Sequence, residues 1–323
     1  MTAAARRLIL RAMSPLTCGA LATCLAAATL AGCSLDRFVV NRMEGSIAAM
    51  ARSMNREASV RHAREASPAL LSMLDGLLEI SPENEGLLLR AAEMNATFAF
   101  ALAEEEDPAW ARALYRKARD YALRALRQED EELAEILDKG EESSVRAALK
   151  ALEPGDGRIP HVFWVSFGTG GLANLSRDEP RALAALPGVL AAMQRLTAIA
   201  PEFYYAGPHL FLAVYYSSRG SALGGNVAES ARHFAEAFSL TEKEGYLLPH
   251  VLYARYHCVA LGEKDAKRAR AAFERELKYV LEAPADRFPD LRLANAVAKE
   301  RAARLLSQID DFILPPLEEE GKP

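Results

Sequence analysis

The sequence has few cysteines, few aromatic residues and no excess of positive charge. Its four cysteines are at positions 18, 24, 33 and 258, so three of them fall within the first 33 residues, which excludes a disulfide scaffold. The net charge of -5 argues against a nucleic-acid binder, which needs a basic face. Alternating strand patterns are almost absent. Because 50% of the residues are hydrophobic and 26% are charged, the 323 residues can build one large domain or two ordinary ones.

The first residues have the features of a secretory signal. Three arginines within the first 11 residues precede an uncharged apolar stretch at 16–30, and Leu30-Ala-Gly-Cys33 resembles a bacterial lipobox. We therefore expect residues 1–32 to be a lipoprotein signal peptide and Cys33 to be the lipidation site. The alternatives are an ordinary signal peptide or an anchor helix. We see no further long apolar run after Cys33, which predicts a body on a lipid tether that faces the periplasm. Ser34 favours the outer membrane over the inner.

Helical periodicity dominates the rest of the chain. Asp107-Pro108 has the form of an N-cap acid with proline at the first helical position, and it predicts a helix over Asp107–Gln128. One face of that helix repeats every three or four residues, through Trp110, Leu114, Ala118, Tyr121 and Ala125. Favourable contacts with the helix dipole explain the preceding acidic run, Glu104 to Asp107, better than metal binding.

A small-x-x-x-aromatic pattern recurs along the chain. Tyr115 follows Pro82 by 33 residues, and Phe234 follows Pro201 by the same interval; a third, shifted copy centres on Phe273. The small residues let paired helices approach closely, and the aromatic ring fills the groove between them. The pattern predicts an all-α fold, a TPR-like α-solenoid, with a plain helical bundle as the alternative. Leu152–Pro160 is expected to be a turn-rich break, and residues 314–323 a disordered tail.

Local motifs for catalysis or metal binding are incomplete. Gly168-Thr-Gly-Gly-Leu-Ala173 follows the strand-like run 161–167 and fits a dinucleotide fingerprint, but no second parallel strand is visible, so a buried helix is the better interpretation. Trp164 is two residues before Ser166, at the position where a hydrolase elbow needs glycine. None of the six histidines forms H-E-x-x-H, so we expect no metal site. Because none of these motifs is complete, we also expect no cofactor and no catalytic residue. Cys258 is expected to be a packed free thiol.

Aromatic residues are concentrated between positions 163 and 216. Core packing is one explanation, and a partly aromatic cavity for an organic ligand is the other. Aromatic walls with a few polar groups suit an amphipathic carboxylate. The candidate cavity residues are Trp164, Tyr204, His209, Tyr215, Tyr216 and Arg219.

Several stretches in order resemble the TatT component family, the lipoproteins associated with tripartite ATP-independent periplasmic (TRAP) transporters. They include Val40-Asn-Arg-Met43, Phe163-Trp164, Ser176-Arg-Asp-Glu-Pro180, Gly207-Pro-His-Leu-Phe-Leu212, Arg232-His-Phe234 and Leu293-Ala-Asn295. Gly220 departs from the family pattern, in which proline is expected after Arg219.

The resemblance implies a TPR-like all-helical domain over residues 33–313, a homotrimer, and a cavity or pore near the interface with a periplasmic DctP-type substrate-binding protein. It supplies no catalytic residue. The function we expect is a non-enzymatic accessory lipoprotein of a TRAP uptake system that docks the binding protein and passes a small organic or hydrophobic ligand. A general TPR scaffold in envelope assembly is the alternative. A peptidoglycan-active enzyme is a second alternative, because Glu142-Ser143 and Glu229-Ser230 show the glutamate–serine pair of lytic transglycosylases.

Overall fold

The computed structural model describes residues 36–176, 179–284 and 287–315, and these residues form helices and no strand. The expected signal peptide, Cys33 and residues 316–323 of the expected tail lie outside them. A short helical segment at 36–42 precedes the first complete helix. The α-helices are α3 Glu44–Asn55, α4 Val60–Ile80, α5 Glu85–Phe98, α6 Pro108–Glu129, α7 Glu131–Lys139, α8 Glu142–Leu149, α9 Ile159–Leu175, α10 Pro180–Ala184, α11 Leu186–Ile199, α12 Phe203–Ser217, α13 Val227–Thr241, α14 Leu248–Leu252, α15 Val259–Gly262, α16 Ala266–Glu282, α17 Arg292–Ser307 and α18 Ile309–Phe312. Two π-helical segments, η1 Ala99–Ala103 and η4 Tyr253–Cys258, and three short 3-10 turns, η2 Ser221–Leu223, η3 Glu242–Glu244 and η5 Pro289–Leu291, complete the set.

Helix starts follow the polar signals in the sequence. The Asp107 carboxylate accepts a hydrogen bond from the Trp110 backbone N–H at 3.0 Å, and Pro108 occupies the first turn of α6. Asn84 caps α5 and Asp130 caps α7 in the same way. Each cap satisfies a backbone donor that the first turn would otherwise leave unpaired. The expected helix and its N-cap are therefore confirmed.

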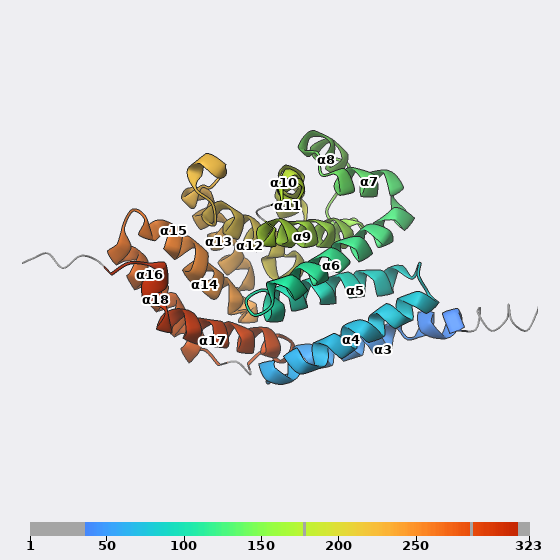
Figure 1. Ribbon diagram of the computed structural model, residues 1–323, viewed down its shortest axis with the longest axis horizontal. Coiled ribbons are helices and arrows are strands. Elements are labelled where there is room, and N and C mark those ends of the chain that lie inside the picture. The colour runs from blue at the N-terminus through green and yellow to red at the C-terminus, as the bar shows by residue number, and fades with distance from the viewer. Residues whose placement is uncertain (1–35, 177–178, 285–286, 316–323) are drawn as a thin grey trace, which may run out of the picture.

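The helices stack as a repeat array whose two ends meet. Figure 1 shows α5, α6 and α9 stacked across the middle of the molecule, with α17 beside α3 and α4 along its lower side. An ion pair joins the two ends, because Arg56 Nε lies 2.6 Å from an Asp290 carboxylate oxygen. The early and late helices thus enclose a common interior.

The three recurring aromatic residues have equivalent positions. Tyr115 on α6, Phe234 on α13 and Phe273 on α16 are all fully buried. The small residues four positions before each ring, Ala111, Ser230 and Ala269, have no exposed surface. The rings fill the grooves between adjacent helices, as the all-α helical-repeat prediction requires, and that prediction is confirmed.

The glycine-rich segment is part of a helix rather than a nucleotide loop. Gly168 lies inside α9, and a Cβ atom there would be 2.9 Å from the Tyr115 carbonyl oxygen of α6. A Cβ at Gly171 would be 2.6 Å from the Tyr115 ring. These glycines therefore let α9 lie against α6. The expectation of a buried helix is confirmed.

Cys258 is buried and free, as expected. Burial raises the pKa of its thiol to about 12, so the thiol stays protonated at neutral pH.

The stretch Ala182–Ile199 has a mean hydropathy of 1.4 over 18 residues, enough by length and composition to cross a membrane. This run corrects the expectation that no long apolar run follows Cys33. In the fold it packs against α8 and α9, and Met193 and Leu196 belong to the core.

Candidate functional site

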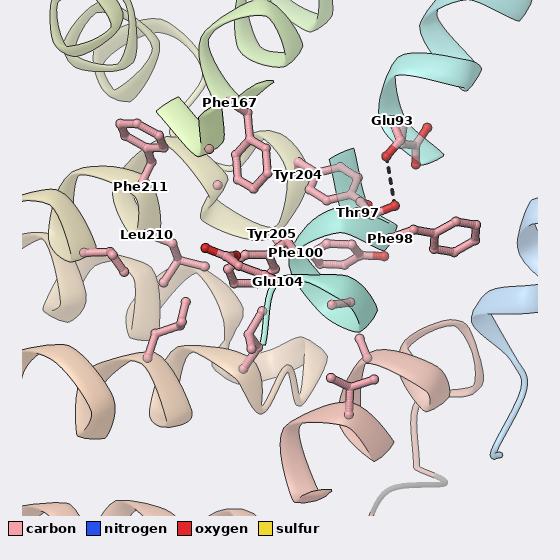
Figure 2. A pocket seen from close by; sticks show the side chains of 18 of the residues that line it. Glu93, Thr97, Phe98, Phe100, Glu104, Phe167, Tyr204, Tyr205, Leu210 and Phe211 are labelled. Atoms are coloured by element: carbon pink, nitrogen blue, oxygen red, sulfur yellow. Dashed lines mark hydrogen bonds between the residues drawn. The ribbon is translucent and has the colours of Figure 1, made fainter. Parts of the chain in front are cut away.

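A cavity of about 240 Å³ opens between the early helices and the late ones. Side chains from α5, η1, α9, α12, η4 and α17 line it, so most of the repeat array contributes to its wall. Figure 2 shows Phe100, Phe167, Tyr204 and Tyr205 around this space, with Glu93, Thr97 and Glu104 among them. The wall is mainly aromatic and aliphatic, with a few carboxylate, amide and guanidinium groups.

A left-handed turn at the start of α12 shapes one wall. Tyr204, Tyr205 and Ala206 have φ values of 47°, 56° and 58°. This conformation costs a non-glycine residue roughly 1–2 kcal/mol, so the surrounding packing must hold it. The turn directs the Tyr204 ring to within 4.7 Å of Trp164 and the Tyr205 ring to within 5.1 Å of Tyr246, measured between ring centroids. The strained turn therefore positions aromatic rings from α12 against two other elements.

The two π-helical segments also border the cavity. Phe100 and Leu102 come from η1, and Tyr256 comes from η4. A π-turn inserts an extra residue into the helical ladder and widens it locally, and such turns are frequent at functional sites. Here the widened turns present Phe100 and Tyr256 to the cavity from segments that are far apart in the sequence.

The carboxylate of Glu104 is held by neighbouring donors. It accepts hydrogen bonds from the Tyr115 hydroxyl at 3.0 Å and from the Asn174 amide at 3.1 Å. Burial, together with the Glu104 charge, raises the pKa of Tyr115 well above its usual value, so the phenol remains a donor. Buried Arg301 donates to the Phe100 carbonyl and lies 5.0 Å above that ring. The polar groups of this end are therefore fixed in place.

Two further ionisable groups are placed differently. Glu93 pairs with Arg90, and burial nevertheless raises the pKa of its carboxyl group. Arg219 is half-buried, and its guanidinium carbon lies 4.1 Å from the centroid of the Tyr215 ring. It also donates to the Ser218 hydroxyl at 3.3 Å. Arg219 thus presents a positive charge at a partly exposed edge of the aromatic wall.

The structure brings together four of the six residues expected at the cavity. Trp164, Tyr204, Tyr215 and Arg219 line it. His209 and Tyr216 are not among its lining residues and contact α13 instead. His209 Nδ1 lies 3.1 Å from Nδ1 of His233, and the Tyr216 ring stacks on that same histidine with centroids 5.9 Å apart.

Several cavity residues lie outside the aromatic stretch of the sequence. Phe100, Tyr246 and Glu93 come from distant segments, and only the closure of the array brings them to the wall. Glu104 belongs to the acidic run attributed to the helix dipole. Within that run only Asp107 caps α6, whereas Glu105 pairs with Arg304. The sequence alone does not distinguish an acid that caps a helix from one that forms an ion pair, because both lie in the same acidic run before α6.

The described residues thus form an all-helical repeat array around a largely aromatic, partly charged cavity, with neither a sheet nor a nucleotide-binding loop among them. The model of the TRAP transporter T-component family, TAtT, matches residues 56–313. The chain therefore belongs to the TRAP transporter T-component family, as the sequence resemblance indicated. Among curated proteins, none matches the chain.

Membership of this family assigns the protein an accessory role in a TRAP transport system of the cell envelope. The family is a transporter component rather than an enzyme family.

Proposed function

We propose that this protein is a lipid-anchored periplasmic component that docks a DctP-type substrate-binding protein and passes a small organic ligand through its cavity. The observation that carries the proposal is the aromatic cavity, which joins residues from both ends of the repeat array. A scaffold that only held other proteins together would not need an interior of this kind. Family membership supplies the transport context.

The wall chemistry favours a small amphipathic carboxylate. A volume of about 240 Å³ suits a small organic molecule and is too small for a folded peptide. The aromatic rings would contact its apolar part, and Arg219, at the edge of the wall, would attract its charge. Arg301 already donates a hydrogen bond to the Phe100 carbonyl oxygen, so it would attract the ligand through its positive charge rather than through a new hydrogen bond.

We also propose that the protein acts as a homotrimer anchored through Cys33, with the outer membrane favoured. These parts of the proposal rest on the lipobox and on the family resemblance. Native mass spectrometry of the purified protein would measure the subunit number directly. A monomer at micromolar concentration would overturn the trimer.

The docking step is tested by measuring binding to the DctP-type protein encoded with the same TRAP permease. Isothermal titration or surface plasmon resonance should show saturable binding to this protein and none to a DctP-type protein from an unrelated TRAP system. Equal binding to both, or to neither, would contradict specific docking. Capture of envelope-assembly proteins without any TRAP component would favour the scaffold alternative.

The ligand step is tested by Trp164 fluorescence. The chain has two tryptophans, so Trp110→Phe leaves Trp164 as the only indole reporter. A series of aromatic and aliphatic monocarboxylates should change its emission saturably, and the matching primary amides should bind more weakly. The absence of any response across the series would contradict the proposed cavity ligand.

A further inference from the structure

Three potential metal ligands meet at one end of the α5, α6 and α9 stack, away from the aromatic wall. Glu85 is in the first turn of α5, Glu129 is the last residue of α6, and His161 is in the first turn of α9. Successive helices of the stack run in opposite directions, so these three helix ends lie together (Figure 1). The spacing of histidines in the sequence gave no sign of this cluster, because each ligand comes from a different helix.

The His161 side chain is fully buried and has no hydrogen-bond partner. Its Nε2 atom lies 3.3 Å from an oxygen of Glu85, and its Nδ1 atom lies 4.0 Å from an oxygen of Glu129. Neither ring nitrogen forms a hydrogen bond. Buried polar atoms without partners are rare, because burial removes the water that would otherwise bind them. Both ring nitrogens therefore lie near carboxylate oxygens without a hydrogen bond to either.

The distances around His161 are compatible with one metal ion. One donor atom from each of the three residues lies within 4.8 Å of the other two. For metal–ligand bonds of about 2.0–2.1 Å, two ligand atoms of tetrahedral zinc lie about 3.4 Å apart. The 3.3 Å between Nε2 and the Glu85 oxygen is close to that value. The 4.0 Å contact of Glu129 is to Nδ1, the other ring nitrogen, so the Glu129 side chain, which is 37% exposed, would have to turn towards Nε2 for one ion to bind all three residues.

The surrounding charges leave the cluster negative. The nearby cation Arg158 pairs with Asp130 at 2.6 Å and with Asp156 at 2.7 Å, so it serves those two acids instead. Glu129 lies at the negative end of the α6 dipole, which favours a cation, whereas Glu85 and His161 lie at the positive ends of α5 and α9, so the two carboxylate charges rather than the helix dipoles would attract the ion. The Glu85 side chain is 43% exposed, which gives an ion a path from solvent.

We propose that Glu85, Glu129 and His161 bind a divalent transition-metal ion of the zinc class. One imidazole and two carboxylates form a borderline-hard ligand set that suits zinc, cobalt or nickel and leaves positions for water. The ion would tie together the ends of three helices. α5 and α9 also carry Glu93 and Trp164 of the cavity, so the ion would brace the walls from outside the ligand space. This site does not depend on the proposed docking or ligand transfer.

The test uses the full chain, without a histidine tag, after treatment with EDTA and dialysis. Titration with cobalt should give visible absorption bands that saturate at one ion per chain. Zinc at a hundred times its dissociation constant should raise Tm by about 5 °C. Both effects should be lost in the double variant Glu85→Gln/Glu129→Gln.

The matched control is Glu131→Gln/Glu132→Gln, which removes the same charge from two exposed glutamates on α7. It should keep the cobalt bands and the zinc-dependent rise in Tm. His161→Gln should abolish both, but because this residue is buried the carboxylate variants provide the decisive comparison. No saturable cobalt binding, or an equal Tm shift in the site and control variants, would overturn the proposal.

Discussion

Trp164 and Tyr204 meet edge to face at the wall of the cavity, with ring centroids 4.7 Å apart and ring planes inclined at 76°. Trp164 belongs to the regular helix α9, whereas Tyr204 belongs to the left-handed turn that begins α12. Trp164 is buried, while Tyr204 keeps surface that faces the cavity. The contact therefore links a buried core residue to a residue in a strained turn of the site. Truncation of a core ring and truncation of Tyr204 should thus have different effects on stability and on ligand binding.

Truncation of Tyr204 should weaken ligand binding more than it weakens the fold. In Tyr204→Ala the backbone strain is unchanged, because alanine and tyrosine both disfavour a φ of 47°. We expect binding of the carboxylate probes to fall at least tenfold, with a loss of unfolding free energy below about 2 kcal/mol. The matched control is Phe163→Ala, since Phe163 contacts the same ring but is buried at 1% exposure. That variant should lose about 3–5 kcal/mol in urea unfolding. Equal stability losses would favour the core-packing explanation.

Substitution of Arg219 tests the charge preference of the cavity. Arg219→Gln removes the cation at the edge of the aromatic wall and keeps much of the side-chain length. A charge-assisted hydrogen bond contributes about 1.5–3 kcal/mol, so carboxylate affinity should fall about 10- to 100-fold, while primary amides should bind as before. Arg116→Gln, at an exposed position of α6, is the control and should change neither. A similar loss for carboxylates and amides would show that Arg219 acts through packing.

The repeat aromatic residues should contribute strongly to stability. Phe273→Ala on α16 empties a groove in which the ring has no exposed surface, so we expect a loss of about 3–5 kcal/mol in the free energy of unfolding. Tyr279 lies on the same helix with 51% of its surface exposed, and Tyr279→Ala should cost less than about 1 kcal/mol. Chemical denaturation followed by circular dichroism measures both. A small effect of Phe273→Ala would remove the groove-filling role assigned to the repeat.

The fold was predictable because its signals are local. Caps such as Asp107 and the spacing around Tyr115, Phe234 and Phe273 depend on residues within one or two helical turns. Those patterns predicted the helices and their recurrence. The glycines near Gly168 were compatible with either a dinucleotide-binding loop or a buried helix. The lack of a second parallel strand in the sequence pattern favoured the helix.

The candidate site was less predictable because its geometry is non-local. The left-handed turn at Tyr204 changes which face of α12 meets the cavity, so Tyr215 lines it and Tyr216 contacts α13. Helical periodicity counted from Phe203 assumes a continuous helix, so it could not predict which residues after this turn face the cavity. Glu93 and the Glu85–His161 contact depend on helix packing, which single-sequence spacing does not encode.

Cys33→Ala tests the anchor. Loss of the thiol should block acylation and leave unprocessed precursor, because the lipobox reaction needs this cysteine. Metabolic labelling with a fatty-acid analogue and the mass of the isolated protein would measure the change. Cys258→Ala is the control, since that thiol is buried within the fold, and it should leave labelling intact. Release of an unlipidated mature protein from wild-type cells would contradict the predicted lipobox.

The buried histidine pair should make the protein less stable in acid. Arg232 can only donate, and its guanidinium lies 3.0 Å from Nε2 of His233, so this nitrogen accepts and the ring proton is on Nδ1. That proton points to Nδ1 of His209 at 3.1 Å. A second proton on either ring would disrupt this arrangement. Burial, followed by the charges of Arg232 and His209, lowers the pKa of His233 from 6.5 to about 4.

The pKa of His233 is lower in the folded state than in the unfolded state, so between pH 6.5 and about pH 4 the unfolded state binds more protons than the folded state. The free energy of unfolding therefore falls as the pH falls below about 6.5. Linkage with these two pKa values gives a loss of about 2 kcal/mol between pH 7.5 and pH 5. Urea unfolding at both pH values should show that the wild type loses about this much more than His233→Gln. The difference between the two proteins removes the contributions of unrelated groups, including Glu93. His62→Gln, at an exposed position of α4, should behave as the wild type. If His233→Gln keeps the full pH dependence, the acid sensitivity arises elsewhere in the protein.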